Sequence, residues 1–121
     1  MSAPHAVSAL SALTVLFALA ACSAPAPPPG DTVQVFKSRG AVQCGARGTP
    51  PEAMRAELER AGLRVRSATC GSDGRMRAAV CGAGTDELNV FEIAASDLAR
   101  AQGLGLTPLA PARDAQVVPC R

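Results

Sequence analysis

Residues 49–81 read TPPEAMRAELERAGLRVRSATCGSDGRMRAAVC, a helix signal followed by two strand signals. Thr49 and Glu52 match a capping box, and a proline in the first helical turn costs no hydrogen bond. Apolar side chains then recur at helical spacing until Gly62, which is placed to end the helix. We therefore expect an amphipathic helix over residues 50–61 that needs a sheet to pack against.

The remainder of this stretch alternates in the manner of half-buried strands. Arginines alternate with apolar or small side chains over residues 63–70, and again over residues 75–81. Asp73-Gly74 lies between the two runs and is a strong signal for a two-residue hairpin turn. With such a turn, four arginines would share one face of the hairpin: Arg64, Arg66, Arg75 and Arg77.

Weaker signals on either side complete a small domain. Residues 32–37 and 88–93 are short β-branched and aromatic runs typical of strands, and Ser96 can cap a short second helix. Further edge strands are predicted at residues 106–109 and 116–118. The order β-α-β-β-β-α-β predicts an α+β fold, in which a small antiparallel sheet carries two helices on one face, ferredoxin-like or a variant of it.

The N-terminal part of the chain has a different composition. Residues 1–21 carry no Lys, Arg, Asp or Glu and are rich in Ala and Leu. This composition indicates a signal peptide, because the segment is too short and too rich in Ala for a permanent transmembrane helix. Residues 22–31 are rich in proline and should form an extended tether ahead of a single domain at residues 32–121.

The end of the apolar segment, Leu19-Ala20-Ala21-Cys22, resembles the lipobox of bacterial lipoproteins. The resemblance implies that Cys22 receives a diacylglyceryl thioether and becomes the N-terminus after cleavage, which would anchor the protein to a membrane of the cell envelope. Ser23 follows, and the absence of Asp at that position favours the outer membrane, with the domain facing the periplasm.

Four cysteines remain in the predicted domain. An even number in an oxidising compartment predicts two disulfides, with three possible pairings. Pairing of Cys70 with Cys81 would clip the hairpin, but a two-residue turn would place Arg77, not Cys81, opposite Cys70. The sequence therefore leaves the pairing open among all four: Cys44, Cys70, Cys81 and Cys120.

Little in the sequence favours catalysis or a metal. Structural zinc sites and thiol oxidoreductases favour close cysteine pairs, whereas the gaps here hold 25, 10 and 38 residues. The only histidine, His5, lies in the segment expected to be removed, so no imidazole remains for Ser-His or Cys-His chemistry. We therefore expect no catalytic residue, no cofactor and no metal ligand.

The four arginines of the predicted hairpin suggest two interpretations. They could bind carboxylates, phosphates or an acidic partner, since guanidinium groups bind such oxygens bidentately. They could equally form a solvated sheet face whose stems cover apolar surface. Nucleic-acid binding is not expected, because the chain has no Tyr or Trp for base stacking.

The resulting hypothesis is an envelope lipoprotein whose non-catalytic domain binds or stabilises another envelope component. Cys70-Gly71, Asp73-Gly74 and Val80-Cys81-Gly82 make the chain similar to small proteobacterial lipoproteins to which no function is assigned. The partners that this hypothesis implies are the membrane, through the lipid, and an envelope protein or peptidoglycan.

Two alternatives remain. A VQVF strand, a helix ending in Ala61-Gly62 and a VFEI strand leading to a second helix resemble the layout of the SPOR domain, which implies peptidoglycan binding. The chain lacks that family's Gly-Pro-Phe type strand end and has an additional predicted hairpin, so no binding residues are carried over. The third hypothesis, a thiol-based redox protein, requires free cysteines.

Overall fold

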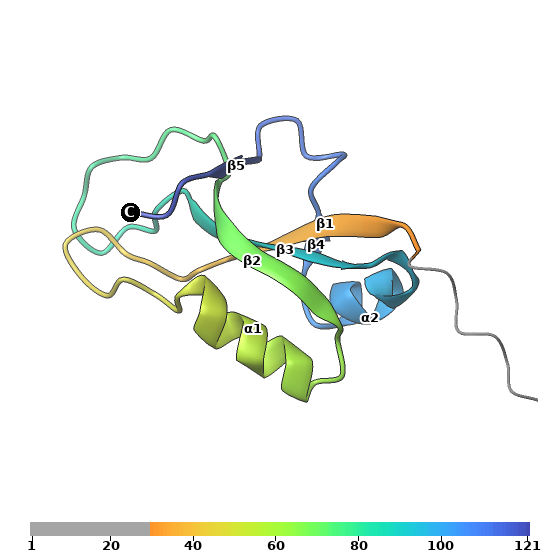
Figure 1. Cartoon of the computed structure of the whole chain (residues 1–121). Coiled ribbons are helices and arrows are strands. Elements are labelled where there is room, and N and C mark those ends of the chain that lie inside the picture. Colours follow the sequence, from red (N-terminus) through yellow and green to blue (C-terminus); the bar gives the residue numbers. More distant parts are fainter. Residues whose placement is uncertain (1–29) are drawn as a thin grey trace, which may run out of the picture.

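The computed structural model describes residues 30–121, which form a five-stranded antiparallel sheet with strand order β4-β1-β3-β2-β5 (Figure 1). The predicted signal peptide and Cys22 lie outside these residues. Both helices lie on one side of the sheet (Figure 1). The predicted α+β class is thus confirmed. The elements in chain order are β1 (Thr32–Ser38), α1 (Pro51–Arg60), β2 (Val65–Ser72), β3 (Glu87–Ala94), the 3-10 turn η1 (Ala95–Asp97), α2 (Leu98–Gly103), β4 (Thr107–Pro108) and β5 (Gln116–Val118).

The main core lies between the sheet and the two helices. The helix-facing side of the sheet contributes Val35, Phe91 and Ile93, which are completely buried. Further buried members of the same cluster come from both helices and the adjoining segments: Met54, Leu58, Leu63, Val65, Ala101 and Leu106. Both helices therefore depend on one shared apolar layer rather than on separate cores.

Helix α1 confirms the predicted helix but not its predicted cap. The N-cap residue is Pro50, which makes no side-chain capping hydrogen bond, so the Thr49–Glu52 capping box is wrong. The C-terminal end is as predicted: Gly62 has a φ of 91°, a conformation that glycine adopts without steric cost. Leu63 N–H then donates to Leu58 C=O at 3.0 Å, which closes the helix end.

The predicted hairpin at Asp73-Gly74 is wrong. Strand β2 pairs instead with β3, and residues 73–86 form an irregular loop without a strand at residues 75–81. The loop is closed at its base, where Asp73 N–H donates to Asp86 C=O at 3.0 Å. The apolar positions of this run found no core to pack against: Met76 is 100% exposed and Val80 59%. An alternating pattern without such a core does not specify a strand.

The side of the sheet opposite the helices is covered by the connection between β4 and β5. This connection, residues 109–115, is called the strap here, and it lies on the helix-free side in Figure 1. The strap begins where Leu109 N–H donates to Gln34 C=O at 2.9 Å. Two strand residues on this side, Leu88 and Val90, are 5% and 1% exposed.

The start of β2 is joined to the start of α2 by an ion pair between Arg64 and Asp97. Nε of Arg64 lies 3.2 Å from Asp97 Oδ2, and the Arg64 backbone N–H donates to the same oxygen at 3.3 Å. Ser96 Oγ accepts from Arg64 Nη2 at 3.1 Å and does not cap α2, so the predicted Ser96 cap is wrong. The hydrogen bond from Arg64 lowers the pKa of the Asp97 carboxyl.

Replacement of Asp97 by Asn tests this ion pair through its pH dependence. Because the pKa of Asp97 is lowered by folding, its charge stabilises the fold above the ordinary Asp value of about 3.9, and that stabilisation is lost as the pH falls through the folded pKa. We expect Asp97→Asn to lower the free energy of unfolding near neutral pH by about 0.5–1 kcal/mol, as for an exposed ion pair. The difference from the unsubstituted protein should therefore shrink at a pH well below the ordinary Asp value, where the folded carboxyl also becomes protonated.

Denaturant unfolding at the two pH values measures the effect, with Glu57→Gln on the exposed face of α1 as the control. A difference that persisted unchanged in acid would show that the ion pair is not its cause.

Candidate functional site

Two disulfides gather at the end of the sheet where β1 and β2 finish. Cys70 on β2 joins Cys120 beyond β5, with a Cα–Cα distance of 5.1 Å. Cys44 joins Cys81 between two loops, with a Cα–Cα distance of 5.0 Å. The two predicted disulfides are therefore confirmed. Their pairing differs from the hairpin clip because residues 75–81 are not opposite β2.

The loop disulfide is supported by hydrogen bonds on both sides of it. Gln43 N–H donates to Ala83 C=O at 2.8 Å, and Gly82 N–H donates to Gln43 C=O at 2.9 Å. The Gln43 side chain also donates to Ala78 C=O at 2.8 Å. The loop of residues 73–86 is thus fixed along most of its length although it contains no regular structure.

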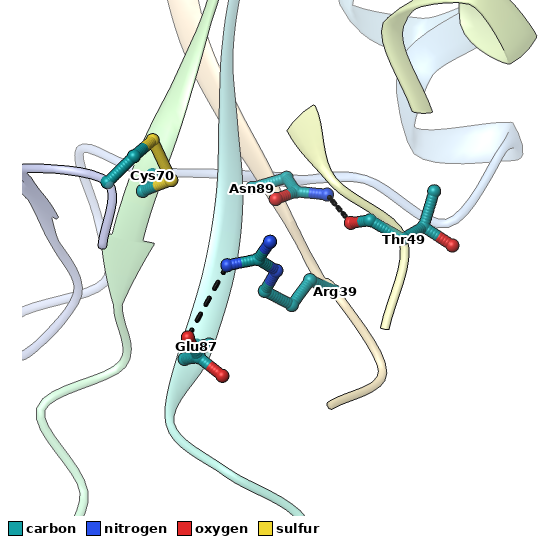
Figure 2. The surroundings of a disulfide bond; sticks show 6 residues. Arg39, Thr49, Cys70, Glu87 and Asn89 are labelled. Carbon is teal, nitrogen blue, oxygen red and sulfur yellow. Dashed lines mark hydrogen bonds and ion pairs between the residues drawn. A yellow bond between two sulfur atoms is a disulfide. The ribbon is translucent and has the colours of Figure 1, made fainter. Parts of the chain in front are cut away.

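Asn89 is a fully buried polar residue beside the Cys70 disulfide (Figure 2). Its Nδ2 donates to Thr49 C=O at 2.8 Å, and Thr49 N–H donates to Arg39 C=O at 2.7 Å. The amide therefore connects β3 to the segment that begins α1, in place of the side-chain cap expected there. Asn89 Oδ1 has no hydrogen-bond partner among the described residues.

Arg39 and Glu87 form an ion pair next to this buried amide (Figure 2). The distance from Arg39 Nη1 to Glu87 Oε1 is 3.4 Å, and the two side chains are 14% and 42% exposed. The other oxygen of Glu87 accepts from Thr85 Oγ1 at 3.3 Å. The Glu87 carboxylate is therefore held from two sides, by Arg39 after β1 and by Thr85 in the loop of residues 73–86.

A polar groove of about 220 Å³ lies over this end of the sheet. Its lining combines the Arg39–Glu87 pair and the Cys70 backbone with other polar side chains, namely Ser72, Asp86, Gln116 and Arg121. Ser72 Oγ donates to Asp86 and accepts from Gly74 N–H, so the hydroxyl stabilises the base of the loop. The Glu87 carboxylate is ion-paired and the Ser72 hydroxyl is already hydrogen-bonded. These groups suit the groove to polar contacts rather than to nucleophilic attack.

A second, more apolar cavity of about 310 Å³ lies under the strap on the helix-free side of the sheet. Its apolar lining comes from the sheet and the strap: Phe36, Leu88, Ala112 and Ala115. The other lining residues carry charged or hydroxyl groups: Ser38, Asp73, Arg75, Arg113 and Asp114. Small-molecule sites likewise combine apolar surface with polar groups that fix the orientation of the ligand.

The four arginines predicted to share a face do not lie together. Arg64 and Arg66 are at the start of β2, and Arg64 is paired with Asp97. Arg75 and Arg77 lie in the loop beyond the other end of that strand. The eight residues of β2 separate the pairs by about 3.3 Å per residue, so the shared face is wrong.

The residues at this end were only partly evident from the sequence. The cysteines were identified by their number, whereas Arg39 and Arg113 stand in Gly- and Pro-rich surroundings that give no signal. Asn89 could have been identified as a buried polar residue, because its amide side chain interrupts the otherwise apolar run LNVF. A polar residue inside a buried run usually has a specific hydrogen-bonding role.

Within residues 30–121, neither helix is long and apolar enough to span a membrane. The same part of the chain contains no group of three His, Cys, Asp or Glu side chains that could hold a metal ion.

Comparison with protein-family models, curated proteins and solved structures finds no match to the chain. Fold and site together define a small α+β domain stapled by two disulfides, with a polar groove at one end and a cavity under a strap.

Separate removal of the two disulfides should show that they stabilise the domain unequally. The chain-entropy model gives about 4 kcal/mol for loops of either length, 50 and 37 residues. Cys70 is buried and its bridge holds β5, so we expect Cys70→Ala with Cys120→Ala to lower the free energy of unfolding more than Cys44→Ala with Cys81→Ala. Denaturant unfolding without reductant measures both, and a greater loss from the exposed Cys44–Cys81 pair would contradict this ranking.

Proposed function

We propose that this chain is an envelope lipoprotein, anchored through a lipid on Cys22, whose domain binds another envelope component without catalysing a reaction. The observation that carries the proposal is that both disulfides of the domain are formed and consume all four of its cysteines. Structural disulfides persist in exported proteins and are rare in the reducing cytosol. The lipobox resemblance supplies the anchor, and the position after Cys22 favours the outer membrane.

The polar groups at the disulfide end support binding over catalysis. The Arg39 guanidinium is paired with Glu87, and the Ser72 hydroxyl is engaged with Asp86. A general base or nucleophile needs a free, reactive group that faces the substrate. Groups already held in mutual contacts are better suited to maintaining the shape of a surface that another molecule contacts.

Intact mass with peptide mapping of the protein purified from bacterial membranes tests the proposal. We expect a lipid adduct on Cys22, and alkylation of Cys44, Cys70, Cys81 and Cys120 only after reduction, because all four are paired. Mapping of the non-reduced digest should recover the peptide pairs 44–81 and 70–120. An unmodified Cys22 would overturn the anchor, and cysteines alkylated without reduction would favour the thiol-based redox alternative.

The alternative of a SPOR-like peptidoglycan-binding module is favoured by one observation. Strands β1 to β4 lie in the order β4-β1-β3-β2, with α1 following β1 and α2 following β3. We propose the ferredoxin-like fold as the finer fold class, because that fold has the same strand order, with β5 and the strap as additions. In this alternative, the helix-free side of the sheet would be the site of glycan contact.

Co-sedimentation with denuded sacculi separates the two functions. We expect the acylated chain, solubilised in mild detergent, to remain in the supernatant, because the strap lies on the helix-free side of the sheet where a glycan strand would have to bind. A membrane lipoprotein of unrelated fold, treated in the same detergent, serves as the control for trapping. Specific sedimentation of this chain would favour the SPOR-like alternative.

A further inference from the structure

We propose that the cavity under the strap binds one small amphiphile that has an apolar body and a single negative charge, such as a medium-chain carboxylate. The inference rests on the proposed function of a binding domain and names a ligand class for it. It concerns the cavity between the sheet and residues 109–115, whose lining shares only Leu88 with the polar groove at the Cys70 disulfide.

The interior of the cavity fits an apolar body. Its volume of about 310 Å³ lies at the lower end of the range of small-molecule sites, about 300–1,000 Å³. Phe36 and Leu88 line it from neighbouring strands β1 and β3, and Ala112 and Ala115 line it from the strap. The small alanine side chains leave the space open, and an alkyl chain there would be withdrawn from water at about 0.8 kcal/mol per CH₂.

The charged residues of the lining fit one negative charge. The side chains of Arg75 and Arg113 line the cavity and make no hydrogen bond or ion pair with any other described residue. Asp73 is already engaged by Arg77 and by the Arg75 backbone N–H. Arg77, which is outside the lining, neutralises Asp73, so the charges that remain in the lining are those of Arg75, Arg113 and Asp114. Their sum leaves one positive charge for a ligand oxyanion.

The strap is held in place before any ligand binds. Ala112 N–H donates to Leu109 C=O at 3.0 Å, and Ala115 N–H donates to Ala112 C=O at 3.3 Å. At the other side of the cavity, Gly74 has a φ of 68°, and a Cβ there would come within 2.5 Å of the Asp114 carbonyl oxygen. A wall that is already ordered avoids the entropic cost of closing around a ligand.

Isothermal titration calorimetry with octanoate and octanamide tests both features of the ligand. The acylated chain in phosphatidylcholine nanodiscs is titrated, and empty nanodiscs give the partitioning blank. We expect octanoate to bind about tenfold more tightly than octanamide, the difference expected from one charge-assisted hydrogen bond partly exposed to water. Equal affinities would overturn the assignment of an anionic ligand, and the absence of binding by both would overturn the site.

Four single substitutions at exposed positions locate the charge. Arg75→Gln and Arg113→Gln should each weaken octanoate binding about tenfold and leave octanamide binding unchanged. Asp114→Asn removes the nearest unpaired carboxylate and should strengthen octanoate binding severalfold. Arg66→Gln, at the far end of β2, is the matched control and should change neither affinity. A loss in the Arg66 variant equal to that in the Arg113 variant would show that only overall charge matters, which would overturn the site.

The outcomes also separate this inference from the proposed function. A lipid adduct on Cys22 without octanoate binding would overturn the ligand assignment alone. Octanoate binding by a chain whose Cys22 is unmodified would support the ligand assignment and overturn the anchor. Nanodiscs containing phosphatidylglycerol identify the source of the ligand: an unchanged octanoate affinity supports a free molecule, and competition by the lipid supports the same anionic chemistry presented by a bilayer.

Discussion

Strand β3 must be covered on both faces, and the rest of the structure depends on this requirement. Four consecutive residues, Leu88, Asn89, Val90 and Phe91, are buried, so neither face can be left to water. The two helices cover the face that carries Phe91, and the strap lies over the face that carries Val90. A domain this small has few residues for a second covering layer, and the strap, an irregular segment with three alanines and one proline, serves instead of helices. The cavity is the consequence, because a short segment of turns covers a sheet face incompletely.

The buried amide of Asn89 places a polar contact within that central strand and ties it to the beginning of α1. The hydrogen bond to Thr49 C=O and the bond from Thr49 N–H to Arg39 C=O form one connected path from β3 to the end of β1. Buried polar paths of this kind fix the relative positions of elements more strictly than apolar packing does. The polar groove therefore lies on a rigid base, and the proposed ligand cavity shares strand β3 with it.

Sequence patterns predicted the elements of this fold correctly wherever the periodic apolar residues are buried in the core. Residues 32–37, 50–61 and 88–93 combine a clear period with buried apolar positions, and each became the element expected. Residues 75–81 alternate equally well but have no apolar surface to face, so local pattern failed where tertiary contacts decide. The pairing of the cysteines, and the presence of Arg113 and Leu88 in one cavity, depend on residues distant in the sequence. No local pattern encodes them, and this is why the candidate cavity could not be predicted.

The crossed arrangement of the two disulfides has a consequence for how the chain matures. Cys44, Cys70 and Cys81 are synthesised well before Cys120. The first correct bond that can form joins Cys44 to Cys81 and leaves Cys70 unpaired between them, until Cys120 is available to pair with it. Oxidation in the order of synthesis would join Cys44 to Cys70 and leave Cys81 without its proper partner. That error can be reversed only by thiol-disulfide exchange, in which a free thiolate attacks the incorrect bond. Burial of Cys70 within the β2–β3 pair opposes the error, so early formation of the sheet protects the fidelity of oxidation. A compartment that oxidises thiols but does not rearrange disulfides would therefore accumulate chains with incorrect disulfides. The yield of correctly folded protein should depend more on disulfide isomerase activity than on the supply of oxidant.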